Sequence, residues 1–194
     1  PVDSIIWLMK DSTLPPVLKI NNPVLASVMG ATLATKRTSA ERLEKGVDIN
    51  ALVIEPYANP FRTYPLINDY EKFKELFEKR NVGCYIFNTG FYLDKKVPKE
   101  VTLGALELIV EGKAEFKAWN DLSDVEYLPI EGFYRELDEE YKEMLNGSLD
   151  YRINFLEKMR EVKGGRDKLP EEALKALYNM KDELNANVSE RVAY

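Results

Sequence analysis

The residues between Gly83 and Gly112 combine the features of an anion-binding turn. An apolar run from Cys84 to Phe87 leads into Asn88-Thr89-Gly90, the cations Lys95-Lys96 follow, and Pro98 opens a segment with helical character. The free N–H groups and the macrodipole at a helix N-terminus both favour a negative charge. A strand, a turn, two cations and a helix start in this order are therefore typical of sites that hold a phosphate or a nucleotide.

Two absences narrow the chemistry of the 194 residues. The chain contains no histidine, which excludes a Ser-His-Asp triad, a Cys-His pair and any imidazole-ligated metal site within it. It also contains no Gly-x-x-x-x-Gly-Lys-[Ser/Thr] phosphate loop. A nucleotide site in this chain must therefore use other groups.

Composition predicts one ordinary domain with a helical appendage. The hydrophobic content is 45%, which suffices for a sizeable core. The net charge of −6 and the pI of about 5.0 argue against broad nucleic-acid binding. The sequence shows no cleavable signal pattern and no apolar run near the ~20 residues of a membrane span. A single cysteine, Cys84, fits a reducing compartment, so we expect a cytoplasmic protein with no nucleic-acid or membrane partner.

The N-terminus predicts a piece of a longer protein. Pro1 leads without a methionine into Ser4–Met9, a run typical of a strand buried on both faces. We expect this strand to have lost its neighbours and the N-terminal part of the same chain to be its partner.

Sequence periodicity predicts an α/β fold, a mixed sheet with flanking helices plus a helical C-terminal segment. Leu14-Pro15-Pro16-Val17 predicts an extended link, and Asn22-Pro23 predicts a helix that fades near Thr35 to Arg37. A mobile loop or short helix is predicted over 38–50, and strands over 52–54, 84–87, 116–119 and 125–128. One further helix is capped by Asn68 or Asp69, and another runs over 99–111 with Val101, Leu106, Ile109 and Val110 inward. The last three predicted helices cover 135–146, 149–162 and 170–185.

Several short blocks follow one another in a specific order. They are Ile5-Ile6-Trp7-Leu8 with Asp11 and Leu14-Pro15-Pro16-Val17; Met29-Gly30-Ala31-Thr32 with Thr38 and Glu41; and Pro60-Phe61, Tyr64-Pro65, Tyr70, Leu76 and Tyr85-Ile86-Phe87-Asn88-Thr89-Gly90-Phe91. Over about residues 5 to 130, this succession resembles the C-terminal half of ATP-dependent phosphoenolpyruvate carboxykinase.

The resemblance implies a nucleotide site. Lys95-Lys96-Val97 matches the family's Lys-Arg-Ile, so Lys96 would pack on the nucleotide and the Val97 backbone would meet the adenine edge. Thr102 matches a nucleotide-contacting Thr. Residues 38–59 would form a lid on a domain spanning 1–132, and 133–194 would be a helical extension packed on that domain.

The implied activity is phosphoryl transfer coupled to oxaloacetate decarboxylation. The implied cofactors are ATP and Mg or Mn, whose ligands in the family lie N-terminal to this segment. We therefore expect the chain to be inactive alone.

Departures from the family pattern keep other functions open. Lys96 stands where the family has Arg, Phe91 where it has Trp, and Met29, Ala31 and Ala34 replace Ser, an aromatic residue and Lys. A non-catalytic scaffold or interaction domain with an eroded nucleotide site is one alternative. Another phosphoryl-transfer enzyme on the same fold is a second.

Each singled-out residue also has a purely structural interpretation. Lys95-Lys96 would be a solvated pair, the Thr102 hydroxyl would face local backbone, and Asn88-Thr89-Gly90 would be only a turn. Cys84 would be a small buried hydrophobe, and Asp11 a turn-forming residue rather than a former metal neighbour.

Overall fold

A mixed five-stranded sheet forms the centre of the molecule. The structure, a computed structural model, describes residues 2–37, 48 and 51–186. The strand order is β1-β5-β2-β9-β8, with β1 parallel to β5 and the other neighbours antiparallel. The predicted α/β class with a mixed sheet is confirmed. The strands are β1 (Ser4–Met9), β2 (Val17–Ile20), β5 (Gly83–Asn88), β8 (Lys117–Ala118) and β9 (Val125–Tyr127).

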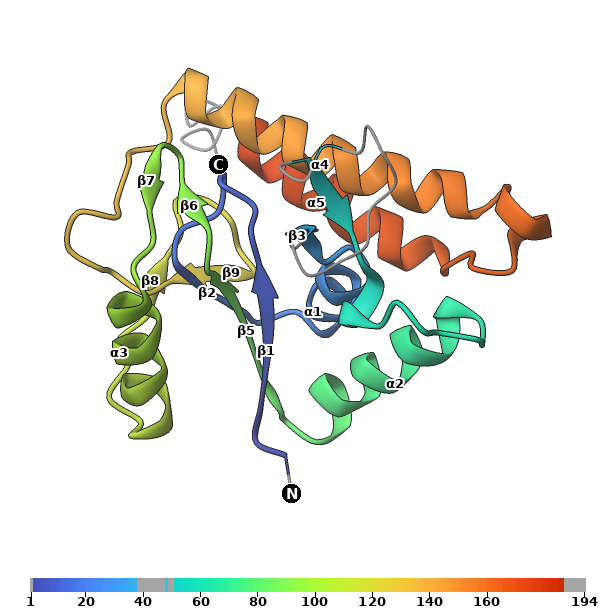
Figure 1. The fold of residues 1–194 in the computed structure, drawn as a ribbon, viewed down its shortest axis with the longest axis horizontal. Helices are drawn as coiled ribbons and strands as arrows, with labels where there is room; N and C mark the ends of the chain where they lie inside the picture. The colour runs from blue at the N-terminus through green and yellow to red at the C-terminus, as the bar shows by residue number, and fades with distance from the viewer. Residues whose placement is uncertain (1, 38–47, 49–50, 187–194) are drawn as a thin grey trace, which may run out of the picture.

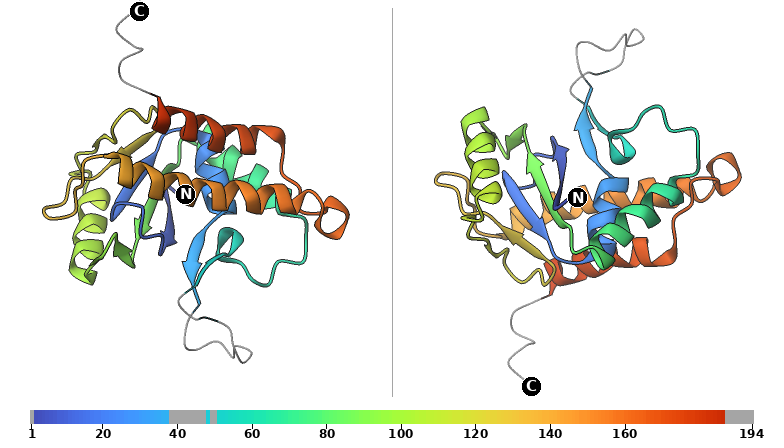
Figure 2. Two further views of the ribbon diagram at one scale, coloured as in Figure 1. Left: turned by 90° about the horizontal axis from the view of Figure 1, so that it is seen from above. Right: turned by 90° about the horizontal axis from the view of Figure 1, so that it is seen from below.

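Helices cover both faces of this sheet unequally. Helix α3 (Lys99–Val110) covers one face alone, while the other helices gather on the opposite side (Figures 1 and 2). Among these, α1 packs against both α2 and α5, and α4 packs against α5. These four helices are α1 (Pro23–Ala31), α2 (Leu66–Lys79), α4 (Glu139–Met159) and α5 (Glu171–Asn185).

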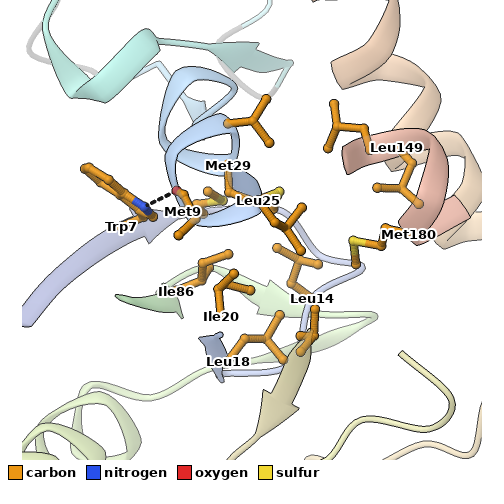
Figure 3. Close-up of a cluster of buried hydrophobic side chains, with 14 of the residues drawn as sticks. Trp7, Met9, Leu14, Leu18, Ile20, Leu25, Met29, Ile86, Leu149 and Met180 are labelled. Carbon is orange, nitrogen blue, oxygen red and sulfur yellow. Dashed lines mark hydrogen bonds between the residues drawn. The ribbon is translucent and has the colours of Figure 1, made fainter. Parts of the chain in front are cut away.

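The larger core lies between the sheet and these four helices. Met9 and Ile86 are fully buried on the sheet, and Met29 of α1, Leu149 of α4 and Met180 of α5 close over them (Figure 3). The C-terminal helices thus share one apolar core with the sheet. A smaller cluster on the other face joins α3 to the sheet through Val17, Phe87, Ala105 and Leu128.

The predicted bounds of the N-terminal strand are confirmed, but the prediction that both of its faces are buried is wrong. β1 is an edge strand of the described sheet, and Leu8 is 57% exposed. Ile6 points into the α3-side cluster, and strand alternation places Leu8 on that same face. The prediction of burial on both faces fails because α3 does not extend over Leu8.

Strand β2 is a central strand that the sequence pattern did not reveal. The predicted extended link runs directly into it, and it pairs with β5 on one side and β9 on the other. Pro16 contributes its carbonyl to the Asn88 N–H at 2.9 Å. The two prolines therefore precede the strand without interrupting its ladder.

Two helix starts show how local and distant caps differ. Asn22 caps α1 as predicted, accepting the Leu25 N–H at 3.0 Å. Helix α2 begins at Leu66, before the predicted Asn68 or Asp69, because the Asp167 carboxylate accepts the Leu66 N–H at 3.0 Å. That cap comes from far along the chain.

The C-terminal segment holds one long helix where two were predicted. Helix α4 runs through Asn146-Gly147 without a break. Asn146 exchanges side-chain amide hydrogen bonds of 2.8 and 2.9 Å with Asn185 of α5. This reciprocal pair holds Asn146 inside the helix. The last predicted helix is confirmed as α5, after a 3-10 turn, η2 (Val162–Gly165).

One short strand precedes the lid-like segment predicted over 38–59, and another lies within it. Helix α1 ends at Ala31, and β3 (Ala34–Lys36) replaces the predicted helix end; β3 pairs with β4 (Leu52–Ile54), a strand that was predicted. A 3-10 turn, η1 (Pro56–Ala58), follows. Tyr57 in η1 stacks on Phe73 at a centroid distance of 4.7 Å. Residues 38–47 and 49–50 of the predicted lid, with Thr38, Glu41 and Arg42, lie outside the described residues.

Candidate functional site: a hollow beside Lys96

The three residues that the sequence assigned to a nucleotide come together around one hollow. Lys96, Val97 and Thr102 line an opening of about 600 Å³ between the end of β5 and the N-terminus of α3. Ligand pockets commonly measure about 300–1,000 Å³, so its size suits a small organic ligand. We call it the Lys96 hollow. Its lining is Thr89, Lys96, Val97, Pro98, Lys99, Glu100, Thr102 and Leu103.

Hydrogen bonds of the Asn88 side chain fix the turn that follows β5, next to this hollow. Asn88 is buried, and its amide donates to the carbonyls of Leu14 and Phe91 at 2.7 Å each. Its side-chain oxygen accepts the Gly90 N–H at 3.1 Å. Asn88 therefore acts as a turn residue, as its structural interpretation predicts, and its side chain has no spare donor for a ligand.

A short hairpin then carries the two lysines. Strand β6 (Phe91–Tyr92) pairs with β7 (Lys95–Lys96), and the Val97 N–H closes the hairpin on the Gly90 carbonyl at 2.9 Å. Because that N–H is already bonded, Val97 can offer an adenine edge only its carbonyl oxygen. This narrows the role that the resemblance gave to the Val97 backbone.

The two lysines differ sharply in their surroundings. Lys95 donates to the Gly132 carbonyl at 2.9 Å, and its ammonium lies 4.3 Å from the centre of the Phe133 ring. Gly132 leaves room for this contact, because a Cβ there would lie 2.5 Å from the ammonium, which is closer than van der Waals contact allows. Lys96 is exposed at the hollow, and no ion-pair partner for it occurs in residues 2–37, 48 or 51–186. Of these two lysines, Lys96 is therefore the one that is available to bind an anion in the hollow.

The first turn of α3 forms the opposite wall. Its N-cap, Pro98, has no side-chain cap, and the Lys99 and Glu100 residues line the hollow. First-turn N–H groups and the helix dipole attract anions. Lys99 adds a positive charge, whereas Glu100 opposes it. For the Thr102 hydroxyl, the described part of the chain supplies no hydrogen-bond partner.

Other residues in the matched blocks belong to the core instead. Met29, Ala31 and Ala34 are buried, and Thr32 donates to the Val28 carbonyl at 2.8 Å. Phe91 is 45% exposed but does not line the Lys96 hollow.

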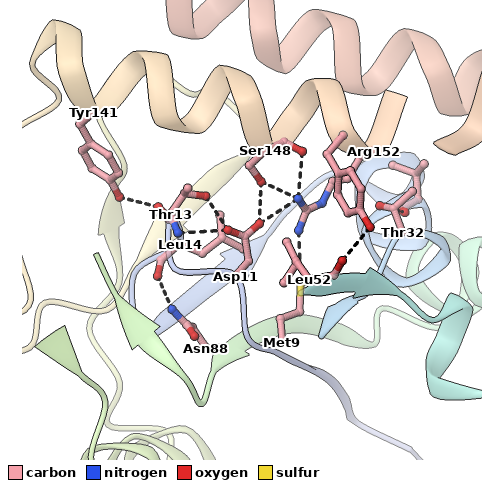
Figure 4. Close-up of polar contacts among 12 residues, drawn as sticks. Met9, Asp11, Thr13, Leu14, Thr32, Leu52, Asn88, Tyr141, Ser148 and Arg152 are labelled. Atoms are coloured by element: carbon pink, nitrogen blue, oxygen red, sulfur yellow. Dashed lines mark hydrogen bonds and ion pairs between the residues drawn. The ribbon is translucent and has the colours of Figure 1, made fainter. Parts of the chain in front are cut away.

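Asp11 belongs to a buried network rather than to the hollow. It is 2% exposed and accepts the Thr13 N–H and hydroxyl at 3.0 and 2.8 Å (Figure 4). Its other oxygen lies 2.8 Å from Arg152 Nη1 and accepts the Ser148 hydroxyl at 2.6 Å. Burial alone raises the pKa of Asp11, but the Arg152 charge and these hydrogen bonds outweigh it and lower that pKa. The turn-forming interpretation of Asp11 is confirmed, and sequence reasoning missed its cation.

Within the described ranges, no cluster of three His, Cys, Asp or Glu residues could hold a metal ion. No described helix is long and apolar enough to cross a membrane. The chain matches neither a protein-family model nor a curated protein. An α/β domain with a mixed sheet is the class that the structure defines.

Proposed function

We propose that the Lys96 hollow binds a nucleotide, with the base against Val97 and the phosphates toward Lys96 and the first turn of α3. The observation that carries this proposal is the convergence of Lys96, Val97 and Thr102 on one opening of about 600 Å³. These residues come from a strand end, a loop and a helix.

The charges of the hollow favour a phosphate only moderately. Lys96 and Lys99 supply two cations and Glu100 one anion. A lysine ammonium is a point charge that cannot bind a phosphate bidentately or stack as a guanidinium does. We therefore expect weak binding by this chain alone.

The larger activity that we propose follows from the sequence resemblance. In this proposal, the hollow is the adenine side of an ATP site in a phosphoenolpyruvate carboxykinase-like protein. The chain is then the C-terminal, nucleotide-binding part of the carboxykinase fold. The intact protein would convert oxaloacetate and ATP to phosphoenolpyruvate, carbon dioxide and ADP. Phosphoryl transfer mainly requires that the protein position the reacting groups and neutralise the charge of the phosphates. The N-terminal part of a longer chain would supply the phosphate loop and the ligands for Mg or Mn.

A non-catalytic domain is the second candidate. The specific observation in its favour is that Met29, Ala31 and Ala34, which replace polar or aromatic residues of the family, are buried in the core. In such a protein the fold persists and the nucleotide site has lost its function.

Calorimetric titration of ATP in the presence of Mg²⁺ tests the hollow. Lys96→Ala should weaken binding about tenfold, because a charge-assisted hydrogen bond is worth about 1.5–3 kcal/mol. Lys72→Ala is the matched control, since it removes the same charge from α2, on the other side of the sheet. Unchanged affinity in Lys96→Ala would refute the role of this lysine. Sub-micromolar affinity in the 194-residue chain would show that the phosphates bind elsewhere.

A further inference from the structure

Lys10 is a cation that stands directly after β1, beside the Lys96 hollow but outside its lining. Strands β1 and β5 are parallel, with Met9 opposite Asn88, and the Thr89 N–H donates to the Met9 carbonyl at 2.9 Å. The pairing therefore continues for one more residue and sets Lys10 next to Thr89, at the strand spacing of about 4.8 Å. Because Thr89 lines the hollow, Lys10 borders it.

The Lys10 side chain points to the same side of the sheet as α3. Its two neighbours, Met9 and Asp11, both contact the Arg152 guanidinium of α4, at 3.7 and 2.8 Å (Figure 4). Successive side chains of an extended chain point to opposite faces, and the first turn after β1 begins only at Ser12. Lys10 therefore points away from α4, toward the face on which α3 and the hollow lie.

Gly90 allows the two strand ends to lie this close. A Cβ at Gly90 would lie 3.3 Å from the Lys10 Cβ and 3.4 Å from its Cα, so a side chain there would crowd the lysine. The turn that borders the hollow is thereby packed directly on the base of the Lys10 side chain. Independently of the strand register, this contact places Lys10 at the edge of the hollow.

Helix α3 leaves the β1 edge of the sheet open. Its sheet contacts run through Ala105 and Ile109, and Leu8 of β1 stays 57% exposed. The prediction that Leu106 and Val110 also face inward was wrong, since they are 36% and 78% exposed. Solvent and ligands therefore have access to this face beside β1.

The Lys10 ammonium is available to a ligand. Lys10 is partly exposed, and within residues 2–37, 48 and 51–186 its side chain forms no ion pair or hydrogen bond. Lys96 and Thr89 line the hollow together, so one cation lies in the hollow and the other at its edge. Because a lysine ammonium binds phosphate as a point charge, this arrangement suits a ligand with more than one phosphate.

We propose that Lys10 binds the outer phosphates of a nucleoside triphosphate whose base and first phosphate occupy the Lys96 hollow. This role rests on the proposed nucleotide site, and it adds selectivity for a triphosphate over a monophosphate. In open α/β sheets, ligands bind in the crevice outside the carboxyl ends of the strands, and Lys10 and Thr89 lie at the carboxyl ends of β1 and β5. The strand spacing of about 4.8 Å is a step that a diphosphate group spans, so the phosphate chain can pass over Thr89 to Lys10.

NMR titrations of the 194-residue chain with ATP and with AMP, each with Mg²⁺, test this role. ATP should shift the backbone amides of both Lys10 and Thr89, whereas AMP should shift that of Thr89 and not that of Lys10. Lys10→Ala should weaken ATP binding about tenfold, because one charge-assisted hydrogen bond is lost, and should leave AMP binding unchanged. Lys10→Arg keeps the charge and should retain most of the ATP affinity. Lys117→Ala is the matched control, since it removes the same charge from exposed β8 at the opposite edge of the sheet.

The outcomes separate the role of Lys10 from the nucleotide site itself. If Lys96→Ala weakens ATP binding and Lys10→Ala does not, the nucleotide site stands and the role of Lys10 is refuted. An equal loss of ATP and AMP affinity in Lys10→Ala would also refute it, because the effect would then not be directed at the outer phosphates. A wild-type chain that binds no ATP at millimolar concentrations would overturn the nucleotide site and the role of Lys10 together.

Discussion

The Asp11 carboxylate lies 2.8 Å from the Arg152 guanidinium, and both side chains are almost inaccessible to solvent. The pair joins the end of β1 to the middle of α4. Arg152 also donates to the Ser148 carbonyl and hydroxyl at 3.1 and 2.5 Å, while its Nε has no partner in the described structure. The ion pair is thus a buried link between the sheet and the C-terminal helices.

Asp11→Asn should destabilise the protein by about 3–5 kcal/mol, because it leaves the Arg152 charge buried without its counter-charge. Urea unfolding followed by circular dichroism measures the loss. Asp3→Asn is the control, since Asp3 is exposed, and it should change stability by less than about 0.5 kcal/mol. Adding Arg152→Met to Asp11→Asn should recover much of the loss. Equal effects of Asp11→Asn and Asp3→Asn would contradict a structural role for the pair.

The same pair predicts a stability change in acid. The folded state holds the pKa of Asp11 below its usual 3.8, so the unfolded chain takes up the proton first as pH falls. The stabilisation is complete above the usual value and is lost as pH falls through the lowered one. Urea titrations between neutral pH and about pH 2 should show a steeper fall below about pH 4 in wild type than in Asp11→Asn. Parallel curves would rule out this contribution.

Cys84 should be unreactive in the native protein. It is 2% exposed, and burial raises the pKa of its thiol, so the nucleophilic thiolate is both scarce and covered. Ellman's reagent should label it only as fast as the protein opens, and fully in denaturant. Rapid labelling of the folded protein would mean that the strand around Cys84 is more open than the structure shows.

Gly30 and Gly104 form a matched pair of helical glycines. A Cβ at Gly30 would lie 2.7 Å from both the Trp7 and Tyr57 rings, whereas one at Gly104 meets nothing within 4 Å. Gly30→Ala should cost about 1–3 kcal/mol through overpacking. Gly104→Ala should instead stabilise α3 by about 0.5–1 kcal/mol. Thermal unfolding compares the two, and a destabilising Gly104→Ala would show that the outer side of α3 is crowded.

The sequence predicted the elements that depend on neighbours along the chain. The Asn22 cap of α1 and the strand of Cys84 both follow from adjacent residues. Lys96, Val97 and Thr102 lie within seven positions of one another, so their place around one hollow also depends on nearby residues.

Features that depend on distant residues escaped prediction. The start of α2 is fixed by Asp167, and α4 passes Asn146-Gly147 because Asn185 holds the Asn146 amide. The sequence did contain one signal for the buried ion pair. Arg152 follows Leu145 and Leu149 on the buried face of α4, where a charged side chain requires a partner. The identity of that partner is a property of the tertiary structure.

The link between Asp11 and Arg152 has a consequence for the order in which the chain folds. During synthesis, Asp11 leaves the ribosome long before α4, and at roughly 5–20 residues per second the delay is on the order of ten seconds. Strand β1 must likewise wait for β5. Throughout this interval an apolar strand and a carboxylate destined for burial lack their partners. The nascent chain therefore depends on later residues to complete β1, and the segment from β1 to Asp11 is the part that a chaperone would need to protect.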